Sequence, residues 1–505
     1  MTSPSSRLII GPFNRVEGDL EVELDVADGR VQQARVVAPM YRGFENMLIG
    51  HDPMDALTIV PRICGICSVS QSVAAAMAIA QVAGVAPSPN GQRAINLMLA
   101  CENLADHLTH FYVFFMPDFT RPVYSARPWY AEACRRFSAI SGGAAGGAHS
   151  RALLAARARW FELMGTLGGK WPHTGSVLPG GSSRAIEPHE ALRMLGRLRE
   201  MRRFLETTLL GVALEEFLAV DTLSGLQAML ARAGGSDLAL LMQIMEDAGL
   251  HTLGPGPGRY LSYGAYVQAA EDRDAAGGQH VFAQGTWDAA TAQVSPLDAS
   301  RIAEDMRHSW MHEGDDGAPL HPSQGITQVL PDKPGAYTWN KAPRLSGQVM
   351  ETGAIARQLM AGQPLVRSAV AQFGGTVSTR VLARLCEAAR ILVLMEGWLQ
   401  ELQPRGAFHA AYTVPAEGAG AGLCEAARGA LGHWLRVEHG RIANYQIVAP
   451  TSWNFSPRDA QGQAGALEMA LQGTHLCLDG ERPADSVAVQ HIVRSFDPCM
   501  VCTVH

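Results

Sequence analysis

The sequence predicts an α+β fold that is mainly helical, with long core helices around a buried metal site and a small N-terminal antiparallel sheet at about residues 7–38. Three observations predict it. An alternating pattern of apolar and acidic residues lies near the N-terminus, apolar stripes at helical spacing follow, and two Cys-x-x-Cys pairs stand at opposite ends of the chain. No fixed-period repeat or linker divides the 505 residues, so we expect one compact body over residues 1–505.

The N-terminal sheet is predicted from two neighbouring runs. Residues 20–26 alternate apolar and acidic side chains, as in a strand with one buried face. A second run extends from Val31 to Val37, and Asp28-Gly29 lies between them. A two-residue Asp-Gly loop fits a type I′ turn, because glycine accepts the positive φ that this turn requires. We therefore expect a half-buried hairpin that ends at Pro39.

The long helices are predicted from apolar residues that recur at steps of three, four and seven. This spacing is found from Gln71 to Ala83 and from Gln92 to Phe115, and it places the apolar side chains on one face of each helix. A third long helix is expected from Val377 to Leu402, which is rich in Leu, Ala, Glu and Arg. We expect the first two helices to lie in the core.

Composition excludes several classes of protein. The net charge is −7, and no run of Lys and Arg indicates a nucleic-acid partner. The most apolar stretch, Ser72 to Val85, is too short to span a bilayer, and residues 1–7 lack the pattern of a signal peptide. Nine thinly spread cysteines, an odd number, do not indicate a disulfide framework. We expect a cytoplasmic location.

The two cysteine pairs are Cys64/Cys67 and Cys499/Cys502. Each pair can bring two sulfurs to one ion, and together they supply four soft ligands. A zinc ribbon usually has about 15 to 20 residues between its pairs, whereas here about 430 positions separate them. The separation favours a catalytic metal centre, and a structural zinc or iron–sulfur site is the alternative.

The residues around both pairs resemble a known family. Arg62–Cys67 and Asp497–His505 are similar to the two metal-binding signatures of nickel–iron hydrogenase large subunits. The resemblance extends along the chain through Arg15–Gly18, Arg42–Glu45, Asp106–Tyr112, Gly169–His173, Tyr337–Arg344, Ala427–Gly429 and Pro450–Asn454.

The resemblance implies a nickel–iron centre with carbon monoxide and cyanide on the iron. Cys64 and Cys499 would be terminal nickel ligands, and Cys67 and Cys502 would bridge the two metals. The implied reaction is the heterolytic splitting of dihydrogen into protons and electrons, with Cys499 as the first proton acceptor. Glu17 would take the next proton, although its spacing alone would suit an ordinary surface residue at the start of a strand.

Further residues acquire roles through the same resemblance. Arg428, with Asp106 and Asp497, would form a polar roof over the metals, since carboxylates hold a guanidinium in a fixed geometry. Thr451 would donate a hydrogen bond to a cyanide. Ala427 stands where many relatives have a proline before the roof arginine, a departure that bears on the orientation of Arg428.

A second, hard cation is also implied, usually magnesium. Glu45 and His505 match the family's ligands, and the backbone carbonyl near Ile447 would complete the set. Carboxylate and carbonyl oxygens suit magnesium, and an imidazole is tolerated. Without the resemblance, His505 would be read as a frayed terminal residue.

The remaining histidines and cysteines near these motifs are expected to be structural. His107 and His110 are interpreted as hydrogen-bonded core residues, because four thiolates already account for the centre. The unpaired cysteines are expected to be small buried apolar residues: Cys101, Cys134, Cys386, Cys424 and Cys477.

Three departures from the common pattern resemble the regulatory, dihydrogen-sensing branch. Gln71 stands where many catalytic members have a histidine. Ile66 and Phe114 occupy gas-channel positions where many hydrogenases carry the smaller Val and Leu. Larger side chains at both positions would narrow the gas channel, so that dihydrogen passes more easily than dioxygen. Simple core packing of Ile66 and Phe114 is an alternative. We expect a dioxygen-tolerant sensor of low turnover, with an energy-conserving uptake hydrogenase as the alternative.

The resemblance also implies partners. The chain offers no iron–sulfur clusters to carry electrons from nickel, so a small subunit bearing them is expected across a large interface. The working unit would be a heterodimer, or a pair of heterodimers. A sensor would signal to a histidine kinase.

Overall fold

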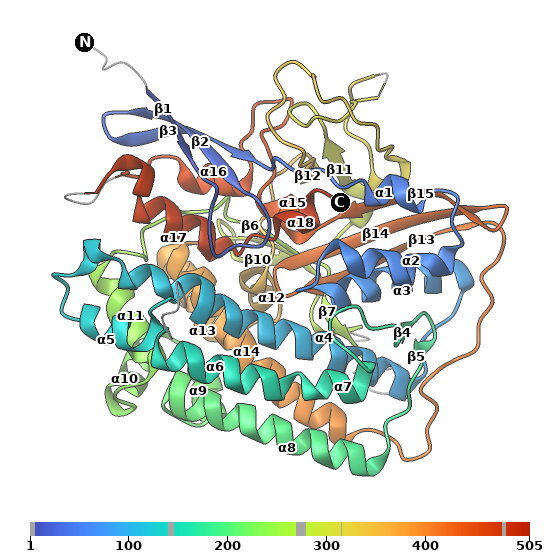
Figure 1. Ribbon diagram of the computed structural model, residues 1–505, viewed down its shortest axis with the longest axis horizontal. Helices are drawn as coiled ribbons and strands as arrows, with labels where there is room; N and C mark the ends of the chain where they lie inside the picture. The colour runs from blue at the N-terminus through green and yellow to red at the C-terminus, as the bar shows by residue number, and fades with distance from the viewer. Residues whose placement is uncertain (1–5, 140–145, 269–278, 315, 477–480) are drawn as a thin grey trace.

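The computed structural model describes residues 6–139, 146–268, 279–314, 316–476 and 481–505. Residues 1–5 and Cys477, to which two of the predictions refer, lie outside these ranges. Most of the long helices gather in one half of the molecule, and most of the small antiparallel sheets lie in the other (Figure 1). This arrangement confirms the predicted mainly helical α+β fold.

The N-terminal sheet has three antiparallel strands in the order β1 (Ser6–Ile10), β2 (Glu21–Ala27) and β3 (Arg30–Val37). Val22 and Leu24 are fully buried, as the alternation predicts. Ala27 pairs with Arg30, which leaves Asp28 and Gly29 as a two-residue loop. Their φ values of 51° and 72° fit the predicted type I′ turn.

The three predicted long helices are α3 (Ser68–Ala83), α4 (Pro89–Thr109) and α14 (Val377–Gln400). The α-helical part of the second is shorter than predicted, because the chain continues as a π-helical turn, His110–Phe115. Helices α4 and α14 run side by side with α6 (Ala148–Trp160) and α8 (Pro188–Phe204) in the helical half (Figure 1).

The described residues form two further three-stranded sheets, neither of which was predicted. The one in contact with α3 consists of β13 (Gly418–Ala426), β14 (Gly429–Glu438) and β15 (Arg441–Val448). Helix α3 lies directly on β13: a Cβ on Gly422 would stand 1.8 Å from the carbonyl oxygen of Ala74, and one on Gly420 would stand 2.2 Å from that of Ala78. The helix that begins after Cys67 therefore rests on this sheet.

Shorter elements complete the described fold. The remaining helices are α1 (Phe44–Leu48), α2 (Ala56–Ile59), α5 (Tyr130–Phe137), α7 (Glu162–Gly168), α9 (Leu214–Leu218), α10 (Leu223–Arg232), α11 (Asp237–Asp247), α12 (Ala354–Met360), α13 (Pro364–Phe373), α15 (Pro450–Asn454), α16 (Ala466–Leu471), α17 (Val487–Phe496) and α18 (Met500–Thr503). The remaining strands are β4 (Val177–Leu178), β5 (Gly181–Ser182), β6 (Arg259–Ser262), β7 (Ala265–Val267), β8 (His280–Phe282), β9 (Gly285–Asp288), β10 (Gln293–Ser295), β11 (Ile302–Asp305) and β12 (Ala342–Leu345).

The C-terminal tail lies inside the molecule. Helix α18 packs against α15, and the chain ends among the sheets rather than at the periphery of the view in Figure 1. His505 is 5% exposed. All four paired cysteines belong to the main apolar core. Among the helices of the described residues, none combines the length and apolarity needed to cross a membrane.

Candidate metal centre

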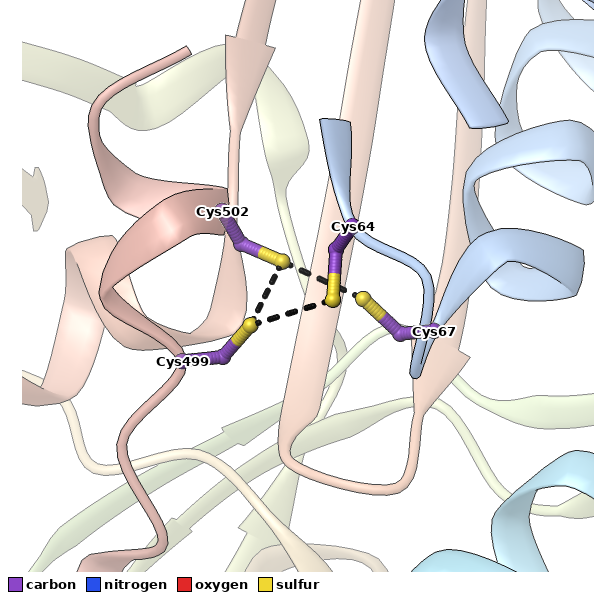
Figure 2. A group of neighbouring side chains, drawn as sticks. All are labelled: Cys64, Cys67, Cys499 and Cys502. Carbon is purple, nitrogen blue, oxygen red and sulfur yellow. Dashed lines mark hydrogen bonds between the residues drawn. The ribbon is translucent and has the colours of Figure 1, made fainter. Parts of the chain in front are cut away.

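The four paired cysteines converge on one point (Figure 2). Their sulfur atoms all lie within 4.8 Å of one another, and none of the four residues is more than 6% exposed. The Sγ–Sγ distance is 3.4 Å for Cys64 and Cys499, 3.1 Å for Cys67 and Cys502, and 2.9 Å for Cys499 and Cys502. Thiols this close and this well shielded from water are arranged to share metal ions.

Short helical turns position the four thiols. Cys64 follows a 3₁₀ turn, and Cys67 directly precedes α3. Cys499 directly precedes α18, and Cys502 lies within it. Each pair thus has one cysteine directly before a helix. The backbone N–H of Ile66 also donates to the Cys64 sulfur at 3.3 Å.

The four thiols do not ionise independently. Hydrogen bonds from Cys499 and the other thiols hold the pKa of Cys64 well below its usual value. The same neighbours raise the pKa of Cys67, and burial raises the pKa values of Cys499 and Cys502. The cluster therefore stabilises one thiolate, and further negative charge requires a cation among the sulfurs.

Segments far apart in sequence fix the second pair. The Glu17 N–H donates to the Pro498 carbonyl at 3.4 Å, and the Met500 N–H donates to the Glu17 carbonyl at 2.7 Å. At Gly18, φ is +79°, and a Cβ there would stand 2.9 Å from the Val501 backbone nitrogen. Position 18 therefore requires glycine.

Glu17 is half-buried in this contact and precedes β2 rather than lying in it. Burial and the negative charge of the nearby Cys64 raise the pKa of its carboxyl group, while Arg428 and Arg42 oppose the shift. A carboxyl group with a raised pKa is suited to exchanging protons near neutral pH.

The three residues predicted to form the polar roof contact one another. Ala427 and Arg428 form the two-residue loop between β13 and β14. The Arg428 guanidinium donates to Asp106 at 2.6 and 3.2 Å and lies 3.2 Å from Asp497. Burial raises the pKa of Asp106 to about 7, despite the opposing effect of Arg428. Burial acts to raise the pKa of Asp497, but Arg428 together with His110 and Arg384 holds it below its ordinary value.

Two further predicted residues adjoin these groups. The Thr451 hydroxyl oxygen accepts a hydrogen bond from the Cys499 backbone N–H at 3.0 Å, which leaves the hydroxyl proton available to another acceptor. The Ala427 carbonyl accepts from Arg357 at 2.8 Å, so a side chain from α12 anchors the loop that carries Arg428.

The three residues that depart from the common pattern lie in two different environments. Gln71 is fully buried in α3, one turn after Cys67. Ile66 and Phe114 are half-buried, and the Phe114 carbonyl accepts a hydrogen bond from Arg15 at 3.2 Å.

The residues predicted to hold a second cation also meet. His505 Nε2 lies 3.2 Å from a Glu45 oxygen, and Ile447 contacts the same carboxylate through its backbone N–H at 2.8 Å. Lys341 donates to both Glu45 oxygens at 3.0 Å. Although burial acts in the opposite direction, Lys341 and His505 lower the pKa of Glu45 to about 2. One Glu304 oxygen in this cluster is buried without a hydrogen-bond partner among the described residues.

The core residues are mostly as predicted. His107 Nε2 lies 2.9 Å from Glu387, and His110 Nε2 donates to the Arg494 carbonyl at 2.6 Å. Both histidines are buried, as are Cys101, Cys386 and Cys424, whereas Cys134 is partly exposed.

Sequence reasoning missed Glu102, Lys341 and His433. The Glu102 carboxylate accepts from the backbone N–H groups of Val69 and Ser70, each at 2.9 Å, and so caps α3 just beyond Cys67. For Glu102 and His433 the available signal was a charged or polar residue amid an apolar helix or strand pattern. Lys341 lies just before β12, outside any such pattern.

These features define a cysteine-ligated metalloprotein whose centre is built from both ends of the chain. Comparison with known proteins gives its family: the chain belongs to the nickel-dependent hydrogenases, whose sequence pattern matches residues 42–139 and 147–505.

Two curated relatives illustrate the similarity. The chain is 30% identical to the periplasmic NiFeSe hydrogenase large subunit of Desulfomicrobium baculatum, in an alignment covering 99% of this chain and 95% of the relative. It is 26% identical to the uptake hydrogenase large subunit of Rubrivivax gelatinosus, with the same coverage.

Solved structures show the same similarity. H2-activated NiFeSe hydrogenase from Dm. baculatum superimposes with a TM-score of 0.81 at 29% identity, covering 99% of this chain and 100% of the other. The reduced Ni-Fe-Se hydrogenase from D. vulgaris Hildenborough gives a TM-score of 0.80 at 29% identity, with equal coverage.

Proposed function

We propose that this chain is the large subunit of a nickel–iron hydrogenase that splits dihydrogen heterolytically and serves as a dioxygen-tolerant hydrogen sensor. The observation that carries the reaction is the convergence of Cys64, Cys67, Cys499 and Cys502 within 4.8 Å in the apolar core. Family membership supports a hydrogenase activity.

The donor set fits a nickel–iron pair. Four soft sulfurs suit both metals, and their burial keeps water from the reacting gas. Cys64 and Cys499 would hold nickel terminally, with Cys67 and Cys502 shared with an iron that carries carbon monoxide and cyanide. When bound, this pair supplies the site at which the hydrogen–hydrogen bond is polarised.

The chain's own residues would move the proton. Cys499 receives it first, and Glu17 receives it next, since the two residues are joined through neighbouring backbone hydrogen bonds. The raised pKa of Glu17 suits a group that both accepts and releases protons.

The polar roof and Thr451 would hold polar groups in fixed positions beside the metals. Asp106 and Asp497 hold the Arg428 guanidinium in place, and a fixed guanidinium stabilises negative charge that develops beside it. Thr451 keeps its hydroxyl proton for a cyanide, because its oxygen already accepts from Cys499.

The second site fits a hard cation such as magnesium. Glu45 and Glu304 supply carboxylate oxygens, His505 supplies an imidazole, and the buried Glu304 oxygen without a partner among the described residues could accept a cation. Lys341 already contributes one positive charge to this cluster. The carbonyl of Ile447 is the remaining proposed ligand.

Electrons must leave through another chain. We assign this role to a small subunit with iron–sulfur clusters, because both relatives described above are large subunits by name. Heterodimers, or pairs of them, would be the working unit, and no nucleic acid is involved.

The sensor assignment rests on Gln71, Ile66 and Phe114. A sensor would turn over slowly, remain cytoplasmic and pass its signal to a histidine kinase. An uptake hydrogenase is the second candidate, and it is favoured by the relatives that carry this name. A periplasmic location would favour the second candidate, since the Desulfomicrobium relative is periplasmic by name.

The experiment that tests the reaction is metal analysis with infrared spectroscopy on the anaerobically purified complex. We expect nickel and iron together with absorption bands of iron-bound carbon monoxide and cyanide. Zinc without these bands would reject the proposal in favour of a structural site.

A separate experiment distinguishes sensor from uptake enzyme. Deletion of the gene should abolish transcription induced by dihydrogen in a sensor and growth on dihydrogen in an uptake enzyme. Loss of growth with normal induction would reject the sensor assignment.

A further inference from the structure

A buried hydrogen-bond chain leads from the metal centre into the sheet formed by β13, β14 and β15. Gln71 lies one turn after Cys67 in α3, and its backbone N–H donates to the Cys67 carbonyl at 3.2 Å. Its side-chain Oε1 lies 2.8 Å from Nε2 of His433 on β14. The other ring nitrogen, Nδ1, lies 2.7 Å from the hydroxyl of Tyr445 on β15. All three side chains are fully buried.

The hydrogen bonds of this buried chain run in one direction from donor to acceptor. The Gln71 Oε1 atom is a carbonyl oxygen and can only accept, so Nε2 of His433 carries the ring proton and donates it to Gln71. With the ring proton on Nε2, Nδ1 accepts from the Tyr445 hydroxyl.

This direction fixes the two ends of the Gln71 amide. Its oxygen is committed to His433, so its Nε2 group must point elsewhere, and Nε2 is buried without a partner among the described residues. A buried donor left unpaired is destabilising, because it has lost its hydrogen bonds to water. An acceptor that arrives with the assembled centre would remove this cost.

We propose that His433 and Tyr445 are positioning residues that hold the Gln71 amide with its Nε2 group turned toward the centre, where it donates a hydrogen bond to the Cys67 thiolate. The inference rests on the proposed function, because Cys67 must be a metal-bound thiolate. An amide needs this support more than a histidine would, since its two ends have opposite hydrogen-bonding character. Reversal would place an oxygen against electron-rich sulfur.

The consequence is electronic. A hydrogen bond to a metal-bound thiolate withdraws electron density from the sulfur and so from the iron that shares it. Loss of the bond leaves the iron richer in electrons, which weakens the carbon–oxygen bond of its carbon monoxide. The infrared band of that ligand should then move to lower wavenumber.

The test compares infrared spectra of anaerobically purified complexes. Gln71→Leu removes the donor and serves as the reference. Tyr445→Phe and His433→Leu remove the two supports, and His433→Gln restores an N–H near the position of Nε2. Tyr412→Phe is the matched control, because the hydroxyl of this half-buried tyrosine lies 3.7 Å from the Met54 sulfur and takes no part in the buried hydrogen-bond chain. Nickel and iron contents are measured for every variant.

We expect Tyr445→Phe and His433→Leu to shift the carbon monoxide band in the direction of Gln71→Leu. His433→Gln and Tyr412→Phe should stay near the wild-type position. Wild-type band positions in Tyr445→Phe, or a shift to higher wavenumber, would overturn the inference. Tyr445→Phe decides alone if His433→Leu does not fold, since it removes a single oxygen atom.

Failure of the proposed function would look different. In that case the wild-type complex itself would lack bands of iron-bound carbon monoxide. Normal wild-type bands that do not respond to either support residue would reject only the positioning role of His433 and Tyr445.

Discussion

Glu17 is held beside Cys499 by backbone hydrogen bonds on both sides, and its raised pKa prepares it to receive a proton. Replacing Glu17 with glutamine keeps the size of the side chain but removes the exchangeable carboxyl proton. We expect Glu17→Gln to lower dihydrogen/deuterium exchange by about 100-fold or more, the usual range for loss of a general acid–base group. Nickel and iron contents should be unchanged.

A matched control for this variant is Glu21→Gln, since Glu21 is similarly half-buried at the start of β2. Exchange at the wild-type rate in Glu17→Gln would remove Glu17 from the proton path.

Ile66 and Phe114 are half-buried, so smaller side chains can be introduced at both positions without emptying the core. If they narrow a gas path, the double variant Ile66→Val/Phe114→Leu should lose activity several-fold faster under dioxygen than the wild type. The rate of inactivation at a fixed dioxygen concentration measures this. Ile59→Val/Phe373→Leu is a control with the same loss of volume elsewhere, and equal rates in both double variants would contradict the gate.

The element that most directly supports the centre is the contact between α3 and β13. Gly422 lets the two backbones touch, because a Cβ there would stand 1.8 Å from the Ala74 carbonyl. We expect Gly422→Ala to separate helix and strand, to cost about 1–3 kcal/mol of stability and to reduce metal content. The unfolding temperature and bound nickel measure both effects.

Gly418→Ala is the control for this prediction. It lies on the same strand, but its Cβ would meet only the flexible Val82 side chain, at 3.0 Å. Equal losses in the two variants would show that strand propensity, rather than the close approach, determines the effect.

The same elements show what the sequence could predict. The hairpin at Asp28-Gly29 and the helices α3, α4 and α14 could be predicted, because each depends on the pattern of apolar and polar residues within its own segment. Strand β13 could not be found this way, because Gly418-Ala-Gly-Ala-Gly422 has low strand propensity. This segment is extended because it pairs with the distant residues of β14 and packs against α3.

The candidate site, like the fold, could be predicted only in part. The spacing of the cysteine pairs indicated shared metal ligands, and a resemblance supplied Arg428, Asp106 and Asp497. Lys341 and His433 were missed because their importance depends on contacts between distant segments, such as the one that links His433 to Gln71.

Across the whole molecule, buried ion pairs join segments that are far apart in sequence. Arg357 of α12 contacts Glu387 of α14 at 2.6 Å, and Arg494 of α17 contacts Asp118 at 2.6 Å. Although burial opposes it, these arginines hold the pKa values of Glu387 and Asp118 below their ordinary values. The stability that these pairs contribute is present above about pH 4.5 and is lost as the pH falls below it.

We therefore expect the unfolding temperature to fall on acidification below pH 5, by an amount that corresponds to about 1.4 kcal/mol for each unit of pKa depression. Glu387→Gln should weaken this dependence of the unfolding temperature on pH. It should also lower the free energy of unfolding by about 3–5 kcal/mol at pH 7, because the buried Arg357 loses the charge of its partner. Glu216→Gln, at an exposed position, should change neither the pH dependence nor the stability at pH 7. Identical slopes in the wild type and Glu387→Gln would contradict this account.

The central claim is that both ends of the chain supply sulfur to a single nickel–iron pair. Anomalous diffraction at the nickel and iron absorption edges, from crystals of the anaerobically purified complex, tests it most directly. We predict one peak at each edge, both surrounded by the sulfurs of Cys64, Cys67, Cys499 and Cys502. A single zinc peak at the centre of the four sulfurs would contradict it.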